Sequence, residues 1–201
     1  MKKILFAVLF LFTLNVTSAQ QENSKDESKS ETLEFLKKDG ACFKKEFYSL
    51  EKIKSLAIEC RVLIITNIVE NTKIGCLRLE GSTDVGTLDY SEIDACVKSL
   101  EFIKSVIGNT PSVYTEIEYA SNDGVEIGAF YSVEGTLLIK QGWNAYVKTD
   151  RYISGTTSYF AAKKIDSFIT MLQIAKALIA DKLNGKKINT LTNISLLGCL
   201  F

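Results

Sequence analysis

Residues 113–131 read VYTEIEYASNDGVEIGAFY, and this stretch decides the fold class. Apolar and polar side chains alternate on both sides of residues 122–124 (NDG), which is the pattern of two half-buried strands joined by a turn. If both apolar faces point into one core, Tyr119 must pair with Ile127. A three-residue loop with Gly124 in the left-handed conformation gives that register. The stretch therefore predicts an antiparallel β-hairpin.

Similar alternation occurs on both sides of this hairpin. Residues 55–64 and 74–80 alternate around a turn-like segment at 70–73, which predicts a second hairpin. After residue 131, turn-like segments at 134–135, 141–142 and 150–151 precede three further candidate strands, at 136–140, at 143–149 and within 152–162. The sequence thus predicts about six strands.

Two longer segments have helical periodicity instead. In residues 93–107, apolar side chains recur every three or four positions, Asp89 and Ser91 are suitable N-caps, and residues 108–111 (GNTP) end the helix. Residues 165–183 form a similar stripe, with Asp166 as a cap and Asn184-Gly185 as the stop. The predicted order is ββ-α-βββ(β)β-α. We therefore expect an α+β fold, in which two long helices pack on one face of an antiparallel sheet of about six strands. The sequence shows no evident internal repeat.

The N-terminal residues 1–19 have the three zones of a signal peptide. Lys2 and Lys3 precede an apolar run at 4–14, and Thr17-Ser18-Ala19 is a suitable cleavage site. The apolar run is too short to span a bilayer, which takes about 20 residues. We expect an exported protein, periplasmic or extracellular, with no transmembrane segment after cleavage. The expected domain organisation is a signal peptide at 1–19, a flexible polar leader at 20–31, one α+β domain at 32–185 and an apolar tail at 186–201.

Composition excludes several function classes. After cleavage the chain has 24 − 2 = 22 basic and 24 acidic residues, so its formal charge is −2, and nucleic-acid binding is not expected. The chain contains no histidine, which removes Ser-His and Cys-His nucleophile pairs and His-bearing zinc sites. It also lacks a glycine-rich phosphate loop. We accordingly expect no cofactor, no metal and no catalytic residue.

Five cysteines in an exported protein suggest disulfides. Cys60 and Cys96 fall on the apolar faces of a predicted strand and a predicted helix, so they could meet in the core. Cys76 has the opposite strand parity, which leaves Cys42 and Cys76 as a second candidate pair. The alternative is that Cys60 and Cys96 are buried free thiols, a common use of cysteine.

The outer face of the hairpin carries the candidate binding residues. Aromatic rings beside carboxylates are suited to holding sugars or peptides, because the rings offer contact area and the polar groups fix orientation. The simpler interpretation is the solvated face of an amphipathic hairpin. Trp143, after the turn at 141–142, is a further candidate. The full set is Tyr114, Glu116, Glu118, Glu126, Phe130 and Trp143.

These observations favour a non-catalytic exported module that binds a protein or glycan of the cell envelope. One alternative is a His-free glycoside hydrolase that uses Glu116, Glu118 or Glu126, since two carboxylates about 7 Å apart on a strand face are within glycosidase range. Another is a structural subunit of an extracytoplasmic assembly, with the apolar tail as its contact.

Overall fold

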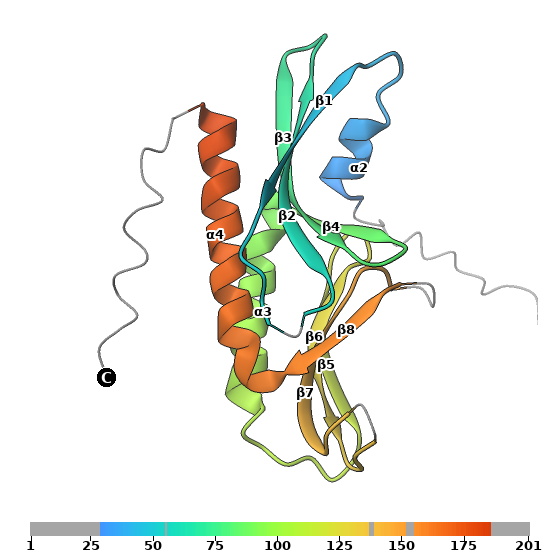
Figure 1. The fold of residues 1–201 in the computed structure, drawn as a ribbon, viewed down its shortest axis with the longest axis vertical. Helices are drawn as coiled ribbons and strands as arrows, with labels where there is room; N and C mark the ends of the chain where they lie inside the picture. The colour runs from blue at the N-terminus through green and yellow to red at the C-terminus, as the bar shows by residue number, and fades with distance from the viewer. Residues whose placement is uncertain (1–28, 55, 137–138, 152–154, 186–201) are drawn as a thin grey trace, which may run out of the picture.

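The computed structural model describes residues 29–54, 56–136, 139–151 and 155–185. It contains two antiparallel sheets of four strands each, with strand orders β1-β2-β3-β4 and β5-β6-β7-β8 (Figure 1). The strands of the first sheet are β1 (Phe43–Ser49), β2 (Glu59–Asn67), β3 (Thr72–Glu80) and β4 (Val85–Asp89). Those of the second are β5 (Thr115–Ala120), β6 (Glu126–Ser132), β7 (Gly142–Lys148) and β8 (Thr157–Ala161).

Each sheet is followed by a long helix that begins with a 3-10 turn. The first sheet leads through η1 (Tyr90–Glu92) into α3 (Ile93–Val106), and the second through η2 (Ala162–Lys164) into α4 (Ile165–Asn184). A short helix, α2 (Glu31–Leu36), precedes the first sheet. In the described part of the chain, no helix is long and apolar enough to cross a membrane. The predicted signal peptide, most of the polar leader and the apolar tail lie outside the described residues.

The α+β class with antiparallel strands is confirmed, but the prediction of one six-stranded sheet is wrong. Two strands were missed. The edge strand β1 (FKKEFYS) is too polar for clear alternation, and β4 (VGTLD) is short and contains a glycine. Conversely, Thr136 and Ile139 belong to a turn, in which the Thr136 N–H donates to the Ile139 carbonyl at 2.7 Å. The expected strand at 136–140 is therefore absent from its described residues.

The central hairpin has the predicted register. Tyr119 pairs with Ile127 across β5 and β6, and Gly124 has a φ of 91°. A residue with a Cβ rarely adopts this conformation, so glycine fits the position. The pairing places Ile117, Tyr119 and Ile127 on the side of the core.

The two halves of the chain have the same element order, β-β-β-β-η-α, although the sequence shows no evident repeat. The first strand, the fourth strand and the long helix of each half begin 72 residues apart, since 115 − 43, 157 − 85 and 165 − 93 each equal 72, whereas the second and third strands begin 67 and 70 residues apart. Sequence identity at this offset is concentrated in the helices, where it includes core residues and charged residues. The identical pairs include Ile93 and Ile165, Asp94 and Asp166, Leu100 and Leu172, Lys104 and Lys176, and Ile107 and Ile179.

Reciprocal ion pairs join the two halves. Lys104 on α3 contacts Asp166 on α4, with 2.5 Å between Nζ and Oδ1, and the equivalent Lys176 on α4 contacts Asp94 on α3. Such an exchange of equivalent partners is the contact pattern of a two-fold axis. The helices therefore lie antiparallel about a pseudo-two-fold axis. The packing is also crossed, in the sense that each helix contacts the sheet of the other half. The helix α3, which follows the first sheet, contacts β5 and β6, whereas α4, which follows the second sheet, contacts β2 and β3 (Figure 1).

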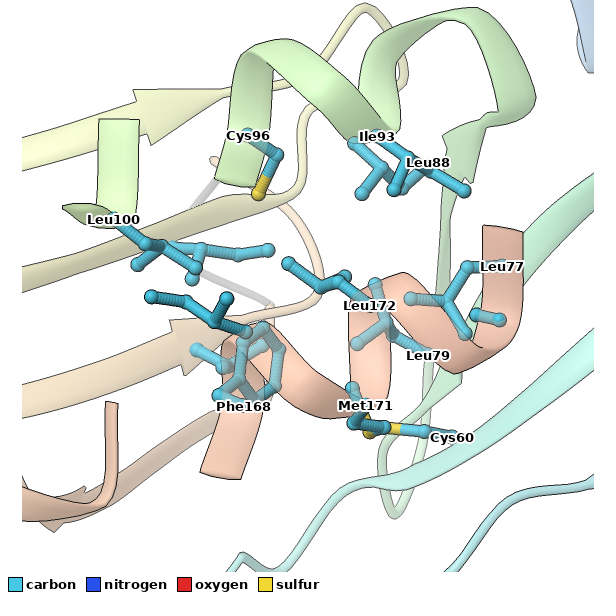
Figure 2. Packing of buried hydrophobic residues seen from close by; sticks show 14 of the residues in the cluster. Cys60, Leu77, Leu79, Leu88, Ile93, Cys96, Leu100, Phe168, Met171 and Leu172 are labelled. Atoms are coloured by element: carbon cyan, nitrogen blue, oxygen red, sulfur yellow. The ribbon is translucent and has the colours of Figure 1, made fainter. Parts of the chain in front are cut away.

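One hydrophobic core results from this crossed packing. Leu77 and Leu79 of the first sheet approach Met171 and Leu172 of α4, with Leu100 of α3 in the same cluster (Figure 2). All five side chains are buried. The main core, whose burial is the dominant favourable term in folding, is therefore shared by the two halves.

A smaller cluster covers the other face of the first sheet, beneath α2. Leu63, Ile65 and Cys76 are buried there against Phe35 and Leu36. This packing explains why β2 is apolar on both faces, beyond the single apolar face that alternation indicated.

Asp89 anchors the start of α2. Its carboxylate accepts hydrogen bonds from the backbone N–H groups of Glu31 (2.6 Å) and Thr32 (3.2 Å), and from the hydroxyls of Ser30 (3.2 Å) and Thr32 (2.6 Å). Ser30 and Thr32 are buried. Residues 30 and 31, which sequence assigned to the flexible leader, therefore belong to the folded domain.

Glu92 ties η1 to the second sheet. Its carboxylate accepts from the backbone N–H groups of Asp89 (3.1 Å) and Asn122 (2.8 Å) and from the Tyr119 hydroxyl (3.2 Å). Burial, with a smaller contribution from the neighbouring Asp89 charge, raises the pKa of this carboxyl above its usual 4.5.

We expect this raised pKa to make the contribution of Glu92 to stability depend on pH. A carboxyl whose pKa is higher in the folded state binds more protons when folded, so its contribution is present below pH 4.5 and declines as the pH rises above that value. The free energy of unfolding of wild type minus that of Glu92→Gln should therefore fall between pH 4.5 and 7.5 in urea titrations. The exposed Glu101→Gln is the matched control for the loss of one carboxylate. A difference that rises with pH would contradict the burial of Glu92.

Candidate functional site

The outer face of the second sheet brings together most of the residues that sequence selected. The register places Glu116 opposite Phe130, and aligns Glu118 with Gly128, Tyr146 and Tyr159 on successive strands. Because side chains alternate along a strand, these residues point away from the helices. We call this surface the tyrosine face and define it as Tyr114, Glu116, Glu118, Phe130, Tyr146 and Tyr159.

Phe130 lies at the centre of the tyrosine face. Its ring centroid is 5.9 Å from that of Tyr114, 6.1 Å from Tyr146 and 5.8 Å from Tyr159. Phe130 and Tyr146 are only 6% and 4% exposed, whereas Tyr114 and Tyr159 are 59% and 47% exposed. The inner rings thus support two outer rings whose surfaces remain open to a ligand.

Gly128 provides space within this face. A Cβ at this position would lie 2.5 Å from the Ile117 carbonyl oxygen and 2.9 Å from the Glu118 Cα, closer than packed atoms allow. Without a side chain between Glu118 and Tyr146 in the row across the sheet, the Tyr146 hydroxyl reaches the Glu118 carboxylate and donates a hydrogen bond to it.

Both carboxylates of the tyrosine face accept hydrogen bonds from tyrosines. The Tyr114 hydroxyl donates to Glu116 at 3.1 Å, as Tyr146 does to Glu118. Partial burial, together with the Glu116 charge, raises the pKa of Tyr114 to about 12. Burial, the hydrogen bond to Glu118 and the charges of both glutamates raise the pKa of Tyr146 as well. Both hydroxyls therefore remain protonated donors near pH 7.

Glu116 and Glu118 differ from Glu126 in their charged surroundings. Among the described residues, no lysine or arginine nitrogen lies within 4.0 Å of Glu116 or Glu118. Glu126, the third predicted acid, differs in this respect, because its Oε2 lies 3.2 Å from the Lys148 Nζ. Negative charge is therefore concentrated at Glu116 and Glu118, beside the exposed rings.

Trp143 lies apart from the tyrosine face. It pairs with Tyr131 on the opposite side of the sheet, and the two rings pack edge to face with centroids 5.7 Å apart. The indole Nε1–H donates to the Asn109 carbonyl at 2.7 Å, so Trp143 holds the connection between α3 and β5 against the core. Tyr146 and Tyr159, by contrast, were not selected from the sequence. The alternation of side chains along β7 and β8 was the available signal, but using it required the pairing register of these two strands.

The candidate disulfide between Cys60 and Cys96 is not formed, because Cys42, Cys60, Cys76 and Cys96 are all free thiols. Both residues are buried in the main core, as their positions predicted. They occupy different parts of it, with Cys60 beside Met171 and Cys96 on the far side of the drawn cluster (Figure 2). Burial raises the pKa of Cys60 and Cys76 to about 12, so these thiols are chemically inert near pH 7. Cys199 lies outside the described residues.

Comparison with known proteins gives no homologue from which to transfer a function: no family model, curated protein or solved structure matches the chain. Within the described ranges, no group of three or more Cys, Asp or Glu side chains is arranged to hold a metal ion. The chemistry of the tyrosine face is thus that of aromatic surface and negative charge.

Proposed function

We propose that this protein is a non-catalytic binding module of the exported space, and that the tyrosine face binds a cationic segment of a partner protein. The observation that supports this most strongly is that Glu116 and Glu118 lie among exposed rings with no lysine or arginine within 4.0 Å in the described chain. The expected signal peptide at residues 1–19 supports a location outside the cytoplasm.

A lysine or arginine side chain matches this surface in two ways. Its charge is attracted by the electron-rich face of a tyrosine ring, an interaction worth about 0.5–2 kcal/mol. Its aliphatic stem covers apolar ring surface while the charged head reaches a carboxylate. Each carboxylate can accept about four hydrogen bonds, so the bonds from Tyr114 and Tyr146 leave capacity at Glu116 and Glu118 for a ligand.

The same geometry favours binding over glycoside hydrolysis. A general acid must be a neutral carboxyl near pH 7, which requires burial or a like-charged neighbour. Glu116 and Glu118 are instead exposed on an edge strand, without the enclosed setting in which such an acid is found.

We expect the mature protein to bind an N-acetylated hexalysine peptide at low ionic strength, as measured by isothermal titration calorimetry. The Glu116→Gln/Glu118→Gln variant should weaken binding about tenfold or more, because two charge-assisted contacts are lost. Tyr159→Ala should weaken it by about three- to tenfold, because an exposed ring is removed.

Three controls make this test specific. The Glu101→Gln/Glu134→Gln variant removes the same charge from exposed positions elsewhere and should leave binding unchanged. A hexalysine acetylated on its side chains should not bind. Equal losses in the two double variants would contradict the proposal, and so would binding of neutral oligosaccharides in place of the peptide. Hydrolysis of aryl glycosides that disappears in Glu116→Gln would establish the hydrolase instead.

A further inference from the structure

A groove lies between the β1–β2 connection and the first half of α4. It has a volume of about 510 Å³ and is lined by residues 50–54 and by side chains of η2 and α4, which falls within the usual range of small-molecule sites, about 300–1,000 Å³. Its apolar lining consists of Leu50, Ile53, Met171 and Ile174.

The polar lining of this groove is mainly basic. Lys52 and Lys54 come from the β1–β2 connection and Lys164 from η2, whereas Glu51 is the single acidic residue among those that line it. The groove therefore combines an apolar surface with an excess of positive charge among its lining residues, which is the complement of an amphipathic anion.

The groove lies where the two halves of the fold differ. The connection between β1 and β2 covers residues 50–58, whereas its counterpart between β5 and β6 covers only 121–125. Lys164 occupies the position equivalent to Glu92, 72 residues earlier. In the first half, the Glu92 carboxylate closes this place by bonding to the short β5–β6 connection at Asn122. At the equivalent place beside α4, the longer β1–β2 connection and Lys164 leave a groove.

Lys164 is also an unfavourable residue for its local position. It is the N-cap of α4 and makes no side-chain cap hydrogen bond, and a cation at a helix N-terminus opposes the helix dipole. The first half instead has an acidic residue there, whose carboxylate accepts from the backbone N–H of Asp89. Residues that break a local rule without a structural gain tend to mark functional sites.

We propose that this groove binds a single-chain fatty carboxylate, with its headgroup at Lys164 and the start of α4 and its alkyl chain along Leu50, Ile53, Met171 and Ile174. The headgroup would neutralise the lysine and receive the favourable end of the helix dipole. The chain would be removed from water by the apolar lining. This site is separate from the tyrosine face and does not rest on its function.

The test is calorimetric titration of the mature protein with dodecanoate below its micelle concentration. We expect a dissociation constant below about 100 μM, weakened at least tenfold in Lys164→Glu. That variant should remain folded, because an acid at this position favours the helix dipole and recreates the arrangement at Glu92. Lys163→Glu is the matched control, since Lys163 is an exposed neighbour that does not line the groove. It should bind dodecanoate within twofold of wild type.

Ligand variation separates the charge from the chain. Dodecanol and dodecyltrimethylammonium should bind at least tenfold more weakly than dodecanoate, and hexanoate should also bind more weakly because it buries less apolar surface. No binding of dodecanoate up to about 1 mM would overturn the proposal. Equal weakening by Lys163→Glu and Lys164→Glu would overturn it as well, since it would show only non-specific attraction to a basic surface.

Discussion

Replacing Asp89 with alanine is expected to destabilise the protein by about 3–4 kcal/mol. The Asp89 side chain is 1% exposed and accepts four hydrogen bonds from Ser30, Glu31 and Thr32. Removing an acceptor leaves buried donors unsatisfied, at a cost of about 1–3 kcal/mol for each donor that cannot reach water. Release of α2 limits the total loss, because its donors can then be solvated while Phe35 and Leu36 lose their contacts with the first sheet.

Urea unfolding measures this loss, and limited trypsin digestion locates it. Cleavage after Lys37 or Lys38 should become faster in Asp89→Ala, since these residues directly follow α2. Asp94→Ala is the matched control, because its carboxylate is 64% exposed and pairs with Lys176 on the surface. A surface ion pair contributes about 0–1 kcal/mol. If the two variants lost the same stability, Asp89 could not be the anchor of α2.

The elements predicted correctly from the sequence are those with a strong local period. The central hairpin, including the pairing of Tyr119 with Ile127, followed from alternation and one glycine. Both long helices followed from apolar spacing. In contrast, the edge strand β1 is polar at most positions and pairs with one neighbour, so its strand conformation depends on β2 rather than on its own pattern.

The division into two sheets could not be predicted because it depends on contacts between distant segments. Alternation shows which side chains share a face, but not which helix covers that face. The crossed packing of α3 on β5 and β6, and of α4 on β2 and β3, is therefore absent from local patterns. The repeat was missed because the connections differ in length and the identical residues are concentrated in the helices.

For the candidate site, the alternation of side chains along the strands was sufficient to predict that four residues share one surface. They lie together there, and they are Tyr114, Glu116, Glu118 and Phe130. Alternation was insufficient for Trp143, whose position depends on the register of β7 against β6. The groove beside Lys164 had no signal in one half of the sequence alone. It becomes evident when equivalent positions of the two halves are compared, which requires the structure.

Phe168→Ala is expected to cost about 3–5 kcal/mol, because it removes a fully buried ring from the shared core and leaves a cavity. Phe168 stacks on Phe160 of β8, with ring centroids 5.9 Å apart. The equivalent position on α3 is Cys96, which is also fully buried. Cys96→Ala removes only one sulfur atom and should cost about 1 kcal/mol.

The comparison of these two variants tests whether the halves contribute unequally to the core at equivalent positions. Urea titrations with an unchanged dependence on denaturant concentration give the two losses directly. A loss of about 3–5 kcal/mol is a large fraction of the 5–15 kcal/mol typical of a whole domain, so Phe168→Ala should be partly unfolded at low urea, whereas Cys96→Ala should resemble wild type. Similar losses in both variants would contradict the packing, because they would require a large side-chain contact at Cys96 or a small one at Phe168. A larger loss in Phe168→Ala than in Cys96→Ala would show that the two-fold symmetry holds for the helices and the surface ion pairs, whereas α4 fills most of the core at this pair of equivalent positions.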